Sequence, residues 1–132
     1  TRGMSSAASD VYKRQNFMKQ VEQAVVEYTG DKEIELSGIW THKTEPHGST
    51  AFHSHTSSKY SFVYYPEVCE GQGNLHFTVF VNDMPRFEKV VEPKEGMLLV
   101  FDSRVSHYTG KNVSGKDRYS ISGNFNTRSN ND

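Results

Sequence analysis

Two histidines, His53 and His55, stand one residue apart in the segment FHSHTSSKYSFVYY. On a β-strand, side chains at positions i and i+2 share a face, so a strand here would aim both imidazoles at one point. Imidazole is the commonest metal-binding side chain in proteins. The pair could therefore supply half of a metal site, although an exposed strand can equally carry two hydrated histidines.

The third ligand would come from far along the chain. His107 ends the segment EPKEGMLLVFDSRVSH, in which Pro93 and Gly96 turn the chain into an apolar strand. We expect this strand to face the strand of the histidine pair and to deliver His107 to the far wall of the same cavity. An iron(II) that activates oxygen needs ligands on one side only, with the other positions open. His53, His55 and His107 would meet that need.

Arg118 and Ser120 lie on a later predicted strand and share one of its faces. A guanidinium pairs with a carboxylate through two hydrogen bonds and keeps its proton, so Arg118 suits an anchor for a carboxylate ligand, and the Ser120 hydroxyl could assist it. Tyr60 or Tyr64 could add a further hydroxyl. The alternatives are that Arg118 pairs with Asp117 at a strand end and that the tyrosines are ordinary wall residues.

The elements that must position these side chains are mostly strands. An amphipathic helix of about four turns is predicted from Asn16 to a C-terminal cap at Gly30. Beyond it, short segments rich in β-branched or aromatic residues alternate with turn signals. These predicted strands are 34–40, 61–65, 75–81, 87–91, 97–101, 105–108 and 118–125. The pattern predicts a mainly β protein of the jelly-roll kind with one N-terminal amphipathic helix.

Composition limits the classes of partner. The 132 residues suffice for one domain, and a net charge of -1 gives no reason to expect nucleic acid or a charged membrane surface. The single cysteine, Cys69, excludes an intrachain disulfide and a cysteine-cluster zinc site. No apolar run approaches the ~20 residues that cross a bilayer. We expect a cytoplasmic protein.

The first fifteen residues are set apart by their composition. Residues 1–9 are mostly small and polar, which is typical of an unordered tail, and SSAASDVYKRQ resembles translated adaptor or non-coding sequence. We therefore expect residues 1–15 to be a disordered or non-native tail. The domain is then predicted to span residues 16–128, and its own N-terminal part could be missing.

Four segments together resemble a known family: HSHTSSKYSFVYY, GQGNLHF, EPKEGMLLVFDSRVSHYTGKN and DRYSISGNF. They look like the 2-oxoglutarate and iron(II)-dependent oxygenases common in phages and marine bacteria, which are similar in core to the prolyl-hydroxylase-like oxygenases. The resemblance covers about residues 35–126. It implies a double-stranded β-helix that binds Fe(II) and 2-oxoglutarate.

The resemblance also implies roles for individual residues. His53 and His55 take the positions of the first ligand pair, and His107 takes that of the distal ligand. Arg118 takes the place of the basic residue that binds the distal carboxylate of 2-oxoglutarate, where hydroxyls of Ser120 and Tyr64 could assist. The implied reaction hydroxylates a small molecule or a protein side chain while 2-oxoglutarate is decarboxylated to succinate.

The sequence departs from the family pattern at His55, where the best understood members carry an acid. Three neutral imidazoles leave a divalent metal with both of its charges, whereas a carboxylate would cancel one of them. Three arrangements are open. His55 ligates the metal; His55 supports a site of two histidines and water; or a carboxylate of Asp102 or Glu45 is the third ligand.

Two other functions compete with the oxygenase. The segment GSTAFHSH resembles the opening motif of cupin enzymes, in which three-histidine metal sites work without 2-oxoglutarate. The chain could also be a non-catalytic jelly-roll binding module whose histidines are incidental. Neither alternative requires Arg118 or Ser120.

Overall fold

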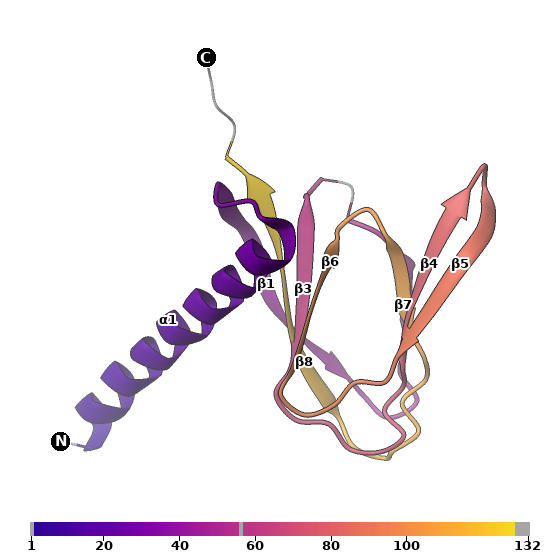
Figure 1. The fold of residues 1–132 in the computed structure, drawn as a ribbon. Helices are drawn as coiled ribbons and strands as arrows, with labels where there is room; N and C mark the ends of the chain where they lie inside the picture. The colour runs from indigo at the N-terminus through magenta and orange to yellow at the C-terminus, as the bar shows by residue number, and fades with distance from the viewer. Residues whose placement is uncertain (1, 56, 129–132) are drawn as a thin grey trace. The chain divides into compact units, whose positions relative to one another are not determined.

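The computed structural model describes residues 2–55 and 57–128, with side chains from residue 13 onward. The chain divides into two compact units at the boundary between Ile34 and Glu35. The first holds the helix α1, and the second holds the strands (Figure 1).

Helix α1 spans Arg2–Thr29. The predicted cap is confirmed, because Gly30 has a φ of 71° and its N–H donates to the carbonyl of Val26 at 2.7 Å. The Thr29 hydroxyl also donates to the Val25 carbonyl at 2.7 Å. No helix in the part of the chain that the structure describes has the length and apolar character needed to cross a membrane.

The helix begins earlier than the sequence predicted. Residues 2–15 continue it, whereas we expected a disordered tail up to residue 15 and a helical start at Asn16. This stretch contains no proline, so nothing in it forbids helical backbone upstream of Asn16. Thr1 lies outside the described residues. That residues 1–15 are non-native, and that the helix and the strands form one domain, remain predictions.

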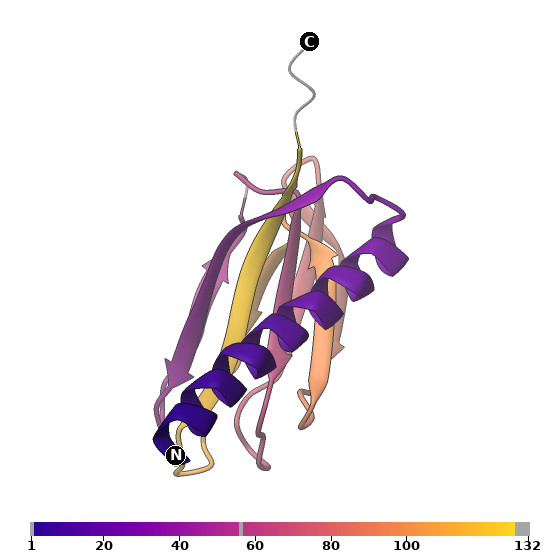
Figure 2. The ribbon, with the colours of Figure 1, turned by 90° about the vertical axis from the view of Figure 1, so that its left-hand side faces the viewer.

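In the part of the chain that the structure describes, eight strands form two four-stranded sheets, which confirms the predicted mainly β fold. Sheet A has the order β1, β8, β3, β6, and its strands lie side by side in Figure 2; sheet B has the order β2, β7, β4, β5. The pairings of β3 with β6 and β8, and of β7 with β2 and β4, are antiparallel. The strand bounds are β1 Ile34–Thr44, β2 Thr50–His53, β3 Tyr60–Tyr65, β4 Leu75–Val81, β5 Met84–Val91, β6 Met97–Asp102, β7 Ser106–Thr109 and β8 Arg118–Thr127.

Residues from both sheets form the hydrophobic core of the strand unit. Val63 and Tyr65 of β3 and Leu75 of β4 are buried at its centre. Partly buried side chains pack around them: Val68, Phe77, Met97, Leu99 and Phe101. The core therefore joins β3 and β6 of sheet A to β4 of sheet B. The functional cavity is lined by residues of these strands and also of β1, β2, β7 and β8.

Candidate metal centre

The three predicted histidines meet in space. One ligand nitrogen from each of His53, His55 and His107 lies within 4.8 Å of the other two. The ring centroids of His53 and His107 are 4.2 Å apart, and that of His55 is 5.1 Å from the first and 5.6 Å from the second. Nitrogens that share one metal lie about 4 Å apart at most, so these rings need to draw only slightly closer to hold one ion.

The route by which they meet differs from the prediction. His107 lies on β7, the neighbour of β2 in sheet B, and its Cα is the register partner of that of His53. His107 is therefore not on a strand that faces the histidine pair across the cavity, as we had predicted. It is on the neighbouring strand of the same sheet, and side chains of adjacent antiparallel strands also lie close enough to share a metal. Strand β2 ends at His53, so His55 lies in the following loop, where its N–H donates to the carbonyl of Ser103 at 2.8 Å.

Backbone carbonyls set the protonation of two of the rings. The Nδ1 atom of His53 lies 2.7 Å from the carbonyl oxygen of Ala51, and that of His107 lies 3.0 Å from the carbonyl oxygen of Val105. A carbonyl can only accept, so Nδ1 carries the proton and the Nε2 lone pair stays free in both rings. Metal-binding histidines use this arrangement. No sequence pattern signals these contacts.

Burial favours the neutral form of the His55 and His107 imidazoles. The pKa of His107 falls from 6.5 to about 4, mainly because the ring is buried; the Val105 carbonyl raises the pKa by a smaller amount, and nearby His53 and His55 each lower it slightly. The pKa of His55 is also lowered, first by burial and then by His53. Neutral imidazole is the metal-binding form. The donors and their geometry therefore fit a divalent metal ion such as Fe(II).

Neither predicted carboxylate alternative reaches this place. Asp102 accepts hydrogen bonds from Nε and Nη2 of Arg104 at 3.1 and 2.8 Å, and this pairing lowers the pKa of the Asp102 carboxyl. Glu45 is exposed and lies 3.4 Å from the ammonium of Lys43. Neither acid is among the residues that line the cavity beside the histidines. Among the described residues, His55 is the side chain that joins His53 and His107 in a cluster able to hold a metal ion.

The histidines open into a cavity of about 410 Å³, a volume typical of small-molecule sites. Arg118 lines the same cavity and is only 3% exposed. Its Nη1 donates to the Gly73 carbonyl at 2.6 Å, and its guanidinium carbon lies 5.4 Å from the centre of the Tyr65 ring. Across residues 2–55 and 57–128 the structure records no ion pair to Arg118, so the alternative pairing with Asp117 is not observed.

Ser120 also lines the cavity and is 9% exposed, but Tyr64 does not line it. The tyrosine at the cavity is the next residue, Tyr65, because neighbouring side chains of a strand point to opposite faces. Burial raises the pKa of the Tyr65 phenol, so it remains a hydrogen-bond donor at neutral pH. Strand β3, with the sequence YSFVYY, is apolar or aromatic on both faces, so its sequence could not show which tyrosine points inward.

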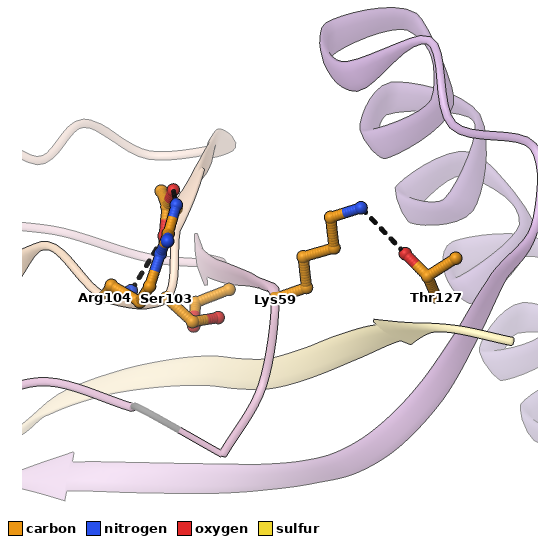
Figure 3. A network of polar contacts seen from close by, with 6 residues as sticks. Lys59, Ser103, Arg104 and Thr127 are labelled. Carbon is orange, nitrogen blue, oxygen red and sulfur yellow. Dashed lines mark hydrogen bonds and ion pairs between the residues drawn. The ribbon is translucent and has the colours of Figure 1, made fainter. Parts of the chain in front are cut away.

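Two residues that we had not assigned to the site complete the lining near the histidines. Trp40 is 39% exposed, and its ring centroid lies 5.8 Å from that of His55. Asn124 of β8 also lines the cavity, and its Oδ1 accepts a hydrogen bond from the Ser61 hydroxyl at 2.7 Å. The nearby ends of β3 and β8 are joined by Lys59, whose Nζ donates to the Thr127 hydroxyl at 3.0 Å (Figure 3).

Solved structures resemble the chain in fold at low sequence identity. An oxidoreductase of the 2OG-Fe(II) oxygenase family from Burkholderia pseudomallei superposes with a TM-score of 0.69 at 13% identity. The aligned residues cover 80% of this chain and 51% of the oxidoreductase chain. A prolyl-4-hydroxylase from Pseudomonas putida gives 0.59 at 24% identity, with 85% and 63% covered. SnoN, a non-heme alpha ketoglutarate dependent epimerase from nogalamycin biosynthesis, gives 0.67 at 16% identity, with 93% and 58% covered.

These likenesses establish the fold, and the chain spans only about half to three-fifths of the length of those proteins. No curated protein matches the sequence. A family model does match, over residues 38–124, a range that contains the three histidines, Arg118 and Ser120. The chain therefore belongs to the family described as "Putative 2OG-Fe(II) oxygenase".

Proposed function

We propose that this protein is an Fe(II)- and 2-oxoglutarate-dependent hydroxylase. In the balanced reaction, an organic substrate, O₂ and 2-oxoglutarate give the hydroxylated substrate, succinate and CO₂. One oxygen atom enters the substrate and the other enters succinate. A bound iron supplies the oxygen chemistry, and the protein binds and orients the reactants and keeps water away from them.

The observation that carries the proposal is the buried Arg118. A guanidinium that is 3% exposed and has no carboxylate partner among the described residues costs free energy unless an anion joins it. It shares a cavity with the three histidines, so one ligand could reach both. A dicarboxylate with a 2-oxo group, which can chelate a metal at one end and pair with Arg118 at the other, matches this layout.

Six residues would then hold the co-substrate and the metal in the cavity. Arg118 would pair with the distal carboxylate, while the hydroxyls of Ser120 and Tyr65 would donate hydrogen bonds to the same group. The Gly73 carbonyl occupies Nη1 of Arg118 at 2.6 Å and so fixes the direction of the remaining guanidinium donors. His53, His55 and His107 would hold the metal through the nitrogens that face one another.

Equilibrium dialysis with ¹⁴C-labelled 2-oxoglutarate tests the proposal, together with succinate formation in the presence of Fe(II) and ascorbate. We expect wild-type protein to bind 2-oxoglutarate when metal is present, and Arg118→Ala to weaken that binding at least about 100-fold, since a buried charge pair is lost. Arg118→Lys should recover part of the affinity, because it restores the charge without the planar fork. Arg86→Ala is the matched control: it removes an exposed arginine of β5 that does not line the cavity, and it should leave 2-oxoglutarate binding unchanged.

The same measurement separates the competing functions. A cupin-like enzyme without 2-oxoglutarate would bind metal through the histidines but would show no 2-oxoglutarate retention, with or without Arg118. A non-catalytic jelly roll would bind neither. Wild-type protein that binds metal and forms no succinate, even uncoupled from a substrate, would contradict the hydroxylase.

A further inference from the structure

Among the residues that the structure describes, no acidic side chain lines the cavity. Its lining holds four histidines and one arginine, and the other lining residues are apolar or uncharged. The two acids that could have entered it, Asp102 and Glu45, are instead paired with Arg104 and Lys43. With neutral histidines, Arg118 is therefore the one charged side chain among the described residues that line the cavity, and any further charge comes from what the cavity binds.

This composition leaves a charge uncompensated when the site is loaded. A divalent metal on three neutral imidazoles keeps both positive charges, and Arg118 adds a third. The co-substrate 2-oxoglutarate brings two negative charges. One positive charge then remains in the cavity, and at its buried part, where Arg118 is 3% exposed, an uncompensated charge costs free energy. A family member with an acid at the position of His55 would have no such surplus.

The cavity also offers free hydrogen-bond donors near His55. The single hydrogen of the Ser61 hydroxyl goes to Oδ1 of Asn124 at 2.7 Å, so the contact of 2.8 Å between Ser61 and Ser103 must have Ser103 as its donor. This chain of hydroxyls fixes the Asn124 amide with Oδ1 already occupied. Across residues 2–55 and 57–128, no hydrogen bond from the Asn124 side-chain NH₂ is recorded, so its two donors are available to a ligand.

Asn124 and Arg118 serve different parts of the cavity. They are six residues apart on β8 and share a face, so their Cα atoms are separated by about 20 Å. Asn124 lies opposite Ser61, near the loop of His55, and the exposed Trp40 ring forms an apolar wall beside that loop. A ligand bound by Arg118 and the metal leaves this region for a second molecule.

We propose that the substrate of this site is a carboxylate anion. Its carboxylate group accepts hydrogen bonds from the Asn124 amide beside His55. The inference rests on the proposed function, because the surplus charge exists only when metal and 2-oxoglutarate are both bound. The inference limits the substrates to carboxylic acids with an apolar or ring portion that can lie against Trp40. The anion takes over the charge that the missing acid would have supplied.

Acetate and acetamide provide a matched pair of probes, because they have nearly the same shape and differ by one charge. The protein is loaded with Co(II) and saturating 2-oxoglutarate, and binding of ¹⁴C-labelled acetate or acetamide is measured by equilibrium dialysis. We expect acetate to bind about tenfold more tightly than acetamide, or better, and Asn124→Ala to weaken acetate binding. Retention of labelled 2-oxoglutarate in parallel samples shows that acetate has not replaced the co-substrate.

The decisive variant is His55→Asp, which returns a carboxylate ligand and removes the surplus charge. It should keep Co(II) and 2-oxoglutarate binding and lose the preference for acetate. The control is His47→Asp, the same change at an exposed loop residue outside the cavity, whose φ of 68° asparagine and aspartate tolerate. This control should retain the preference, which excludes a general effect of net charge.

The possible outcomes are distinguishable. If wild-type protein fails to bind 2-oxoglutarate in the presence of metal, the proposed function fails and this inference fails with it. If 2-oxoglutarate binds but acetate and acetamide bind equally, or acetate only displaces 2-oxoglutarate, the function stands and the anionic substrate is excluded. A preference for acetate that persists in His55→Asp would also overturn the inference, since the charge argument would then be wrong.

Discussion

His107 shows how its surroundings fix the chemistry of a single side chain. It is 6% exposed, its ring packs against Phe101 and Phe77 at centroid distances of 5.0 and 6.0 Å, and its Nδ1 proton is held by the Val105 carbonyl. These contacts orient Nε2 before any metal arrives. They also make the ring costly to protonate, which links the candidate site to the stability of the fold.

The linkage has a definite sign. The pKa of His107 is about 4 in the folded protein and 6.5 in the unfolded chain, so between these values the unfolded chain binds more protons. The metal-free protein should therefore lose stability as the pH falls from about 6.5 to about 4, by up to about 3 kcal/mol from this group. Urea unfolding of wild-type protein and His107→Gln at several pH values measures the difference. If the two pH profiles are parallel, His107 does not titrate in this way.

Trp40 offers a direct report on the metal. It is the only tryptophan in the chain, and its ring lies 5.8 Å from that of His55. Because open-shell ions quench nearby indole fluorescence, titration with Co(II) or Ni(II) should quench the emission saturably. We expect His53→Ala and His107→Ala to abolish the saturable phase, while His47→Ala, at an exposed position outside the cavity, keeps it. Equal quenching in all four proteins would show that the metal binds elsewhere.

At the scale of elements, the loop from β3 to β4 holds the arginine in place. Its Gly73 has a φ of 92° and supplies the carbonyl that binds Arg118, and Gln72 beside it is 4% exposed and donates to the carbonyls of Lys116 and Asp117 at 3.5 and 3.3 Å. A side chain at Gly73 would overlap the Gly110 carbonyl oxygen. The loop therefore has no room for a side chain at Gly73, the residue whose carbonyl contacts Arg118 at the start of β8.

Gly73→Ala should affect 2-oxoglutarate binding and leave metal binding unaffected. The substitution strains the backbone and displaces the carbonyl that orients Arg118, so we expect a lower melting temperature and weaker 2-oxoglutarate binding, with Co(II) affinity unchanged. Gly115→Ala is the matched control, because Gly115 has a φ of 79° but open space around it. If both variants reduce 2-oxoglutarate binding equally, backbone strain alone explains the effect, and the Gly73 contact is not required.

At the scale of the whole strand unit, a metal would cross-link parts of the chain that are distant in sequence. His53 and His55 lie at and after the end of β2, and His107 lies on β7. A ligand that binds only the folded state stabilises it by about 2.7 kcal/mol at 100 times its dissociation constant. The melting temperature should therefore rise by several degrees with Co(II) or Ni(II), and EDTA should reverse the rise. A shift that persists when His53 and His107 are both alanine would locate the stabilising metal elsewhere.

The sequence determined the kinds of element and most of their bounds. Alternation and turn signals identified strands that match β3, β4, β6 and β8 closely, because period-two burial and turn chemistry are local properties of the chain. The spacing of His53 and His55, the distant His107 and Arg118 were chemically distinctive enough to predict a metal and a carboxylate anchor. The family match over residues 38–124 agrees with that prediction.

Only the tertiary structure decided which of these side chains meet and which stay apart. The pairing of β2 with β7 placed His107 beside His53, the inward face of β3 selected Tyr65 over Tyr64, and the pairing with Arg104 removed Asp102 from the cavity. The hydroxyl chain that orients Asn124 joins residues from β3, β8 and the turn after β6. Strand pairing, facing and ion pairing depend on residues far apart in sequence, so no local pattern could have revealed them.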